Sequence, residues 1–212
     1  MAHVYCFGDS ITRGENDPVH GGWVDRLKRL FIGRFLREGA HEVCVFNLGI
    51  GGETTRSLKK RFLPELNARF DREERSIVIL AYGANDAARA GKSHLTPAGL
   101  YLENLAYCIR AAKRKNAKVL LLNITPVAAA AEGRPTPSGK VRRREFIGRY
   151  NAALKLLARE NKVPLLDVHR AFVERGSESL FNADGVHPNA DGHGVIYRLA
   201  LEALTDALKD GR

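Results

Sequence analysis

The chain has 212 residues, of which 44% are hydrophobic and 27% are charged, a composition typical of a globular protein with one sizeable core. We therefore expect a single domain over residues 1–212. The longest apolar runs are far shorter than the roughly 20 residues that cross a bilayer, so we expect no membrane insertion. The first residues lack the basic stretch and apolar region of a secretory signal, which predicts a cytoplasmic protein.

Short apolar runs alternate with amphipathic stretches along the chain, a pattern typical of a parallel sheet with helices on both faces. The predicted strands are, in chain order, Val4 to Phe7, Glu42 to Asn47, Ser76 to Tyr82, Lys118 to Asn123 and Pro164 to Asp167. Apolar residues spaced by three or four predict the helices, at Trp23, Leu27, Leu30 and Phe31, at Leu58, Phe62 and Leu66, at Leu102, Leu105 and Ile109, and at Ile196, Leu199, Leu204 and Leu208. The predicted fold class is α/β.

One segment, residues 125–140, is too long for an ordinary strand-to-helix turn and is rich in alanine, proline and glycine. Long loops in compact domains tend to be lids, binding loops or disordered segments. We predict a mobile flap beside the site, with plain disorder as the alternative.

The three cysteines, Cys6, Cys44 and Cys108, lie among apolar residues and are expected to be reduced core residues. Cys6 and Cys44 lie on strands that we place side by side, so a disulfide between them is the alternative. The odd number of cysteines and the absence of a signal argue against it.

The formal net charge of +10 is larger than a domain of this size needs for solubility. Two basic clusters contribute to it, one made of Arg56, Lys59, Lys60 and Arg61 and one made of Arg134, Lys140, Arg142, Arg143 and Arg144. We expect solvated helix faces, with a field that attracts anionic substrates or nucleic acid as the alternative. The chain has no basic-aromatic alternation, zinc-ligand spacing or recognition-helix pattern, so we expect no nucleic-acid partner.

Polar motifs follow the predicted strands at their carboxyl ends, where ligands bind in an open parallel sheet. The first strand leads into Gly8–Ser10, the second into Asn47–Thr54 and the third into Gly83–Asp86. After the fifth strand and a short helical stretch comes Asn182–Asn189. All four motifs should therefore open onto one rim of the sheet.

This set of residues suits nucleophilic catalysis by a serine. A serine hydroxyl needs a positioned base to take its proton, and the base needs a carboxylate to hold its tautomer. Ser10 is the candidate nucleophile, His187 the base and Asp184 its orienting partner. The oxyanion that forms on attack needs donors already in place, and Gly52, Asn85 and the backbone amide of Ser10 fit that role.

Two alternatives compete with these assignments. Asp17 and His20 have the same Asp-x-x-His spacing and lie in the loop after the first strand, so they are a rival for the base. The glycine run Gly49–Gly52 lacks the remaining residues of a dinucleotide fingerprint or a phosphate loop, and a tight turn at the sheet edge is its structural alternative.

Taken together, the motifs resemble the SGNH hydrolases, a subgroup of the GDSL lipases and esterases, over about residues 5–199. In this chain, Gly8–Gly14 resembles the first sequence block of that family and Asn47–Thr54 resembles the second. Gly83–Asp86 resembles the third block, and Asp184–Asn189 with Gly192 resembles the fifth. No Gly-x-Ser-x-Gly elbow surrounds the serine, so the α/β-hydrolase family is not the match.

The resemblance implies a flavodoxin-like three-layer α/β/α sandwich with a five-stranded parallel sheet, and catalysis without metal or organic cofactor. It implies that Ser10 is the nucleophile, His187 the base and Asp184 its orienting partner. It also implies that Gly52 and Asn85 are oxyanion donors. Gly51 is the alternative to Gly52, because three glycines crowd this turn. Trp23 and Asp86 are expected to serve packing and loop fixing.

The predicted function is hydrolysis of carboxylic esters through an acyl-enzyme. Short acyl or acetyl groups are favoured, because only Val127 and Ala128–Ala131 are expected to be available to line an apolar acyl pocket. An acyltransferase, or a thioesterase or lysophospholipase, with the same triad is the alternative. A non-catalytic module that binds anions is a more remote one.

Overall fold

The computed structural model describes residues 1–209, so the last three residues of the predicted domain lie outside the described part. All five predicted strands are present and form one parallel sheet in the order β2-β1-β3-β6-β8. They are β1 (Ala2–Gly8), β2 (Val43–Gly49), β3 (Arg75–Ala81), β6 (Lys118–Leu122) and β8 (Leu165–Leu166). The predicted α/β class with a five-stranded parallel sheet is confirmed.

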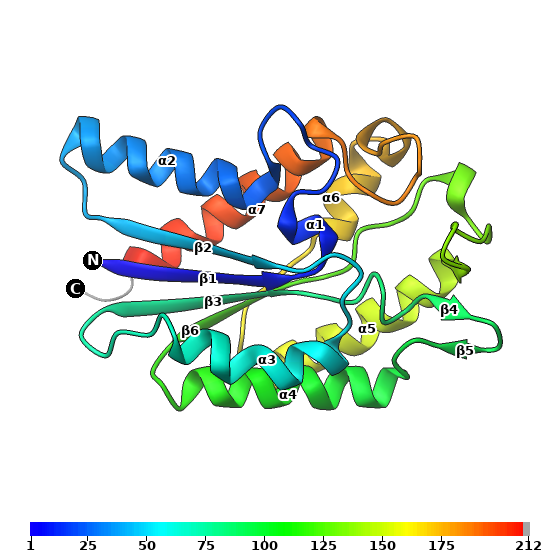
Figure 1. Cartoon of the computed structure of the whole chain (residues 1–212), viewed down its shortest axis with the longest axis horizontal. Coiled ribbons are helices and arrows are strands. Elements are labelled where there is room, and N and C mark those ends of the chain that lie inside the picture. Colours follow the sequence, from blue (N-terminus) through cyan, green and yellow to red (C-terminus); the bar gives the residue numbers. More distant parts are fainter. Residues whose placement is uncertain (210–212) are drawn as a thin grey trace.

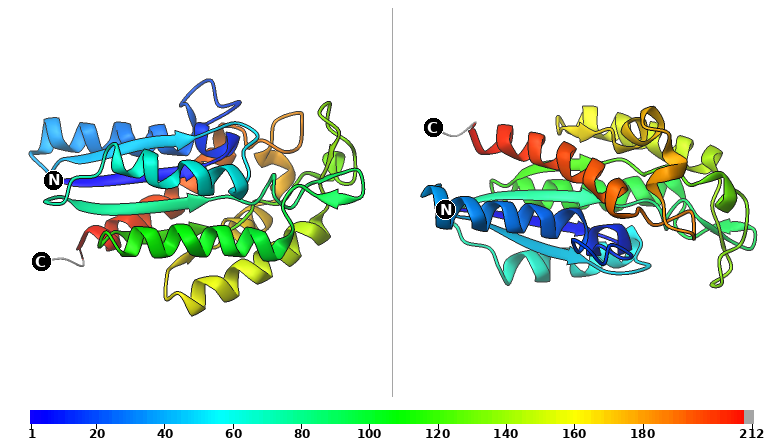
Figure 2. Two further views of the ribbon diagram at one scale, coloured as in Figure 1. Left: turned by 60° about the horizontal axis from the view of Figure 1, so that its bottom comes forward. Right: turned by 90° about the horizontal axis from the view of Figure 1, so that it is seen from above.

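Helices cover both faces of this sheet (Figure 1). One face carries α2 (Gly22–Glu38), α6 (Val168–Glu174) and α7 (Ala190–Lys209), and the other carries α3 (Thr55–Asn67), α4 (Ala98–Lys113) and α5 (Arg144–Glu160). Two further views show α7 beside α2 on the same face (Figure 2). The arrangement is the expected three-layer α/β/α sandwich.

The alternation of side chains along the strands produces the two cores of the sandwich. In β1, Val4 and Cys6 pack with Trp23 of α2, whereas Tyr5 and Phe7 pack with Phe62 of α3. Successive side chains of a strand point to opposite faces, so a strand buried on both sides is apolar throughout. The predicted packing role of Trp23 agrees with this position.

The strand order creates a crevice at the end of β1. The chain leaves β1 through α2 to reach β2 on one side, and it returns through α3 to reach β3 on the other side of β1. Where consecutive connections leave a parallel sheet in opposite directions, the loops at the carboxyl ends diverge and leave room for a ligand. The loops after β1 and β3 meet at this point.

A small second sheet, which the sequence analysis did not predict, lies beyond this rim. It consists of β4 (Arg89–Ala90), β5 (Ser93–His94) and β7 (Lys140–Val141), in the antiparallel order β5-β4-β7. β7 ends the 125–140 segment, which also contains the short helix η1 (Ala129–Ala131). The segment thus has secondary structure of its own, and its mobility stays a prediction.

Two smaller expectations concern the cysteines and the membrane. All three cysteines are free, with Cys6 and Cys108 buried and Cys44 half-buried. Within residues 1–209, no helix is long and apolar enough to cross a membrane.

Candidate active site

Ser10 begins a short helix at the end of the central strand. β1 ends at Gly8, and α1 (Ser10–Arg13) follows, with the Asp9 carboxylate accepting a hydrogen bond from the Ile11 amide at 3.0 Å as the N-cap. A Cβ on Gly8 would lie 1.9 Å from Thr12 Oγ1, so only glycine allows this close approach of α1 to β1. The sharp turn therefore presents Ser10 at the rim of the sheet.

A continuous chain of hydrogen bonds joins Ser10, His187 and Asp184. Ser10 Oγ lies 2.8 Å from His187 Nε2, and His187 Nδ1 lies 2.6 Å from Asp184 Oδ2. The other carboxylate oxygen of Asp184 accepts the backbone amides of Val186 and His187, each at 2.9 Å. The fold thus brings the three predicted residues together from the two ends of the chain.

The loop that carries Asp184 and His187 is closed by its own hydrogen bonds. The backbone amide of Asn182 donates to the His187 carbonyl at 2.9 Å, and the Asn182 side chain donates to the Pro188 carbonyl at 2.9 Å. Partial burial opposes ionisation of Asp184, but the hydrogen bonds from His187 and the two amides outweigh it and lower the pKa of this carboxyl. Asp184 is therefore ionised at neutral pH and can stabilise a positively charged imidazole ring.

The predicted oxyanion donors lie on the two loops beside Ser10. Asn85 is buried after β3, and its Nδ2 donates to the Glu53 carbonyl at 3.1 Å and, more weakly, to Asp9 Oδ2 at 3.5 Å. Within the described residues, the backbone amides of Ser10 and Gly52 donate to no other group. Two free amides and one side-chain amide thus border the same hollow as Ser10 Oγ.

The two candidate glycines face different neighbours. Gly52 has a φ of 74°, a conformation that favours glycine, and a Cβ on it would lie 3.6 Å from Lys140 Nζ, a neighbour of Asn85. A Cβ on Gly51 would instead face Arg13 and Glu15. The geometry favours Gly52 as the residue on the Asn85 side.

Asp86 anchors the loop that carries Asn85. Its Oδ1 accepts hydrogen bonds from the Thr55 backbone amide at 2.9 Å and from the Thr55 hydroxyl at 2.6 Å. These bonds tie the loop after β3 to the first turn of α3, in agreement with the predicted loop-fixing role.

The rival Asp17 and His20 form a different structure. Asp17 is buried, and its carboxylate accepts the backbone amides of His20 and Gly22 and the guanidinium of Arg26. Its oxygens contact the backbone of His20 and not its ring, and Ser10 Oγ is bonded to His187. The geometry therefore favours His187 as the base.

Comparison with known proteins identifies the family. Residues 6–195 match the GDSL-like Lipase/Acylhydrolase family, which is most of the chain. The chain belongs to this family. The resemblance to GDSL and SGNH hydrolases inferred from the four motifs is thereby confirmed, and this GDSL-family protein is an ester hydrolase.

Individual relatives are distant but span nearly the whole hydrolase. The isoamyl acetate-hydrolyzing esterase of Saccharomyces cerevisiae is 24% identical over 208 residues, covering 93% of this chain and 84% of that enzyme. The uncharacterized lipoprotein YqeF of Bacillus subtilis is 27% identical, covering 92% of this chain and 86% of that protein.

Solved structures share the fold. A lipase/acylhydrolase from Enterococcus faecalis superposes with a TM-score of 0.78 at 24% identity, covering 98% of this chain and 97% of that one. The acetyl xylan esterase Axe2 from Geobacillus stearothermophilus superposes with a TM-score of 0.72 at 22% identity, covering 95% of this chain and 93% of that one.

Basic residues that were expected to be solvated are buried at the site of this GDSL hydrolase. The Arg142 guanidinium is 8% exposed and donates to the Asn85 Oδ1 atom at 3.0 Å and to the Ala84 carbonyl at 3.2 Å. Arg61 of the other cluster pairs with Glu53 at 2.6 Å. The charge runs alone did not reveal the contacts of Arg142, because these contacts join residues more than fifty positions apart in the sequence.

The hollow that contains Ser10 is lined mostly by polar side chains. Its volume is about 520 Å³, and Thr136, Pro137 and Ser138 of the 125–140 segment line it together with the proposed site residues. The segment therefore lies beside the site, as predicted. Of the residues expected to be available for an acyl pocket, Val127 and Ala128 are buried in the core, whereas Ala130 and Ala131 line an adjoining hollow of about 230 Å³ that Asp184 and Val186 also line.

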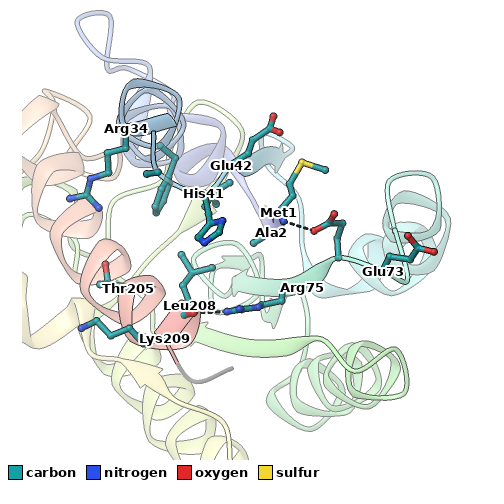
Figure 3. Close-up of a pocket in the computed structure, with 14 residues that line it drawn as sticks. Met1, Ala2, Arg34, His41, Glu42, Glu73, Arg75, Thr205, Leu208 and Lys209 are labelled. Carbon is teal, nitrogen blue, oxygen red and sulfur yellow. Dashed lines mark hydrogen bonds and ion pairs between the residues drawn. The ribbon is translucent and has the colours of Figure 1, made fainter. Parts of the chain in front are cut away.

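A second hollow, of about 840 Å³, lies at the opposite end of the sheet (Figure 3). Met1 and Arg75, at the amino ends of β1 and β3, line it, and Arg75 donates to the Leu208 carbonyl at 2.6 Å. It is larger than the hollow at Ser10 but lies far along β1 from that serine, and we assign it no role in catalysis.

Proposed function

We propose that this hydrolase cleaves short-chain acyl or acetyl esters through an acyl-enzyme formed on Ser10. The observation that carries the proposal is the hydrogen-bonded chain from Ser10 Oγ through His187 to Asp184, with distances of 2.8 and 2.6 Å. Nucleophile, base and orienting carboxylate are each within the reach that this chemistry requires.

In the first half of the reaction, Ser10 Oγ attacks the ester carbonyl while His187 Nε2 takes the hydroxyl proton. Asp184 stabilises the resulting imidazolium through Nδ1. The tetrahedral intermediate then collapses, the bond to the alcohol oxygen breaks, and His187 returns the proton to the leaving alcohol. The acyl group stays on Ser10.

In the second half, water replaces the alcohol. His187 takes a proton from the water as it attacks the acyl carbonyl, and the carboxylic acid leaves as the proton returns to Ser10 Oγ. In both halves the negative charge on the carbonyl oxygen is stabilised by the amides of Ser10 and Gly52 and by the side chain of Asn85.

The size of the hollow and two relatives support short acyl groups. The space of about 520 Å³ is lined mostly by polar side chains, and Pro137 and Val186 are the only apolar side chains among its lining residues, so it offers no long apolar wall to a fatty chain. One relative hydrolyses isoamyl acetate, and Axe2 is an acetyl xylan esterase. For Axe2, variants with a serine or a histidine replaced by alanine are catalytic mutants, which agrees with roles for both residue types.

An acyltransferase, a thioesterase or a lysophospholipase would use the same triad and differ only in what occupies the leaving-group and acceptor sites. Product analysis with added alcohols separates hydrolysis from transfer. The cytoplasmic location also stays a prediction, and one of the relatives is a lipoprotein.

The triad is tested by the single variants Ser10→Ala and His187→Ala on p-nitrophenyl acetate. Each should lower kcat by at least about a thousandfold, because removing either partner leaves no activated nucleophile. His20→Ala is the matched control and should keep most of the activity. Full activity in Ser10→Ala would end the proposal, and a large loss in His20→Ala alone would transfer the role of base to His20.

A further inference from the structure

Two cations converge on the side chain of Asn85. Arg142 Nη2 donates to Asn85 Oδ1 at 3.0 Å, and Lys140 Nζ donates to the same oxygen at 3.2 Å. Both come from β7 and the residue that follows it, more than fifty positions away in the sequence. Within residues 1–209, neither cation has a carboxylate partner within ion-pair distance.

The neighbours of Asn85 define which way its amide faces. Lysine and arginine only donate hydrogen bonds, so the oxygen of the amide must face them. On the other side, the nitrogen faces the Glu53 carbonyl at 3.1 Å and Asp9 Oδ2 at 3.5 Å, which both accept. The reverse orientation would set the NH₂ group against two cations.

We infer that Arg142 and Lys140 are positioning residues that lock the Asn85 amide and strengthen it as an oxyanion donor. A charged donor on an amide oxygen draws electron density from the nitrogen, so the N–H groups become better donors. Because the contact from Asn85 Nδ2 to Asp9 Oδ2 is long, at 3.5 Å, the N–H group on that side remains available to a substrate oxygen. The inference rests on the proposed function.

Arg142 is suited to this work because its position is held from two sides. It is nearly fully buried, and its Nε donates to the Ala84 carbonyl at 3.2 Å while Nη2 holds Asn85. A planar guanidinium holds two acceptors of one loop in a fixed geometry, whereas the donors of an ammonium group do not form a rigid fork. Lys140 approaches from the solvent side, between Asn85 and Gly52.

The inference is tested by a double-mutant cycle between Arg142→Gln and Asn85→Ala on p-nitrophenyl acetate. Asn85→Ala should lower kcat by about a hundredfold to a thousandfold. Arg142→Gln should lower kcat by about tenfold with little change in KM, but by less than about twofold when Asn85 is already alanine, because it acts through Asn85. Lys140→Met should show the same pattern with a smaller loss.

Three controls separate this role from others. Arg143→Gln removes the same charge from the exposed next residue and should leave kcat unchanged. Arg142→Lys should restore part of the loss, because it keeps the charge but not the two-point contact. Thermal unfolding of each variant shows whether it is folded. If Arg142→Gln does not fold, Lys140→Met still tests the inference.

A second substrate distinguishes the role in the oxyanion hole from binding of a substrate anion. The variants are also assayed with 4-acetoxybenzoate, whose alcohol part carries a carboxylate. Equal fractional losses of kcat on both substrates are expected. The inference would be overturned if the cation variants changed only KM, and only for the anionic ester. It would also be overturned if Arg142→Gln lowered kcat as much in the Asn85→Ala background as in wild type. Wild-type activity in Asn85→Ala, or in both Arg142→Gln and Lys140→Met, would overturn it as well. The Ser10→Ala result tests the proposed function separately.

Discussion

Asp9 is a buried acid that directly precedes Ser10 in the sequence. Burial raises the pKa of its carboxyl to about 6, and the negative charge of Asp86 adds to this rise. The Ile11 amide and the positive charges of Arg142 and His187 act in the opposite direction without cancelling it. The neutral form of Asp9 is thus favoured in the folded protein relative to the unfolded chain, in which the carboxyl group has its ordinary pKa of 3.8.

This shift predicts how stability depends on pH. Below pH 3.8 Asp9 is neutral in both states, whereas above pH 6 the folded protein must hold a buried charge. The free energy of unfolding should therefore fall between about pH 4 and 6.5, by about 3 kcal/mol from this group. Urea unfolding of wild type and Asp9→Asn across this range tests it, since asparagine keeps the cap but does not titrate.

Parallel stability curves for wild type and Asp9→Asn would contradict the assignment. Asp184→Asn provides a control of opposite sign, because the pKa of Asp184 is lowered in the folded protein. The stability from Asp184 is present above pH 3.8 and is lost as the pH falls through the lower folded pKa. The stability difference between wild type and Asp9→Asn should therefore change with pH above about pH 4, whereas the difference between wild type and Asp184→Asn should change below it and have the opposite sign.

The junction between β1 and α1 is the element on which the position of Ser10 depends. A Cβ on Gly8 would meet Thr12 Oγ1 at 1.9 Å and the Ala81 carbonyl oxygen of β3 at 2.9 Å. The backbone carbonyl cannot move aside without disturbing the sheet. The strand-to-helix turn therefore requires glycine at this position.

Gly8→Ala should lower the free energy of unfolding by about 1–3 kcal/mol, as overpacking does, and should also lower kcat because Ser10 shifts with α1. Gly148→Ala in α5 is the matched control, since a Cβ there meets nothing within 4 Å. It should raise stability by up to about 1 kcal/mol and leave kcat unchanged. Denaturant unfolding measures both, and wild-type stability in Gly8→Ala would contradict the packing argument.

The small antiparallel sheet shows where the prediction of strands from the apolar pattern of the sequence fails. β4, β5 and β7 have two residues each, too few to display a period of two, and β7 lies within a segment that we predicted only as a flap. Pairing of β7 with β4 is a tertiary contact that delivers Lys140 and Arg142 to Asn85. Long regular strands and helices were predictable because their burial repeats along the sequence.

At the scale of the whole molecule, the strand order and the hollow at Ser10 are the basis of the proposed preference for short acyl groups. The crevice at the carboxyl end of β1 is bordered by loops from both ends of the chain, and the 125–140 segment closes one side of it. We therefore expect the acyl group of the ester to bind in this hollow and its alcohol part to lie near solvent.

A series of p-nitrophenyl esters tests this limit. Acetate or butyrate should give the highest kcat/KM, and octanoate and longer esters should be lower by about tenfold or more, because the hollow has no apolar wall for the extra methylenes. Ser10→Ala provides the background rate for each ester. A kcat/KM that rises steadily with chain length would contradict the short-chain proposal and favour a lipase-like acyl site.

The sequence by itself determined the layers, the five strands and the polar motifs at their carboxyl ends, because periodic burial and motif spacing are local properties. Only the tertiary structure decided which histidine lies against Ser10, since Asp17 and His20 have the same spacing as Asp184 and His187. It also decided that Arg142 is buried on Asn85 instead of solvated. Such contacts join residues far apart along the chain, and a charge run carries no information about them.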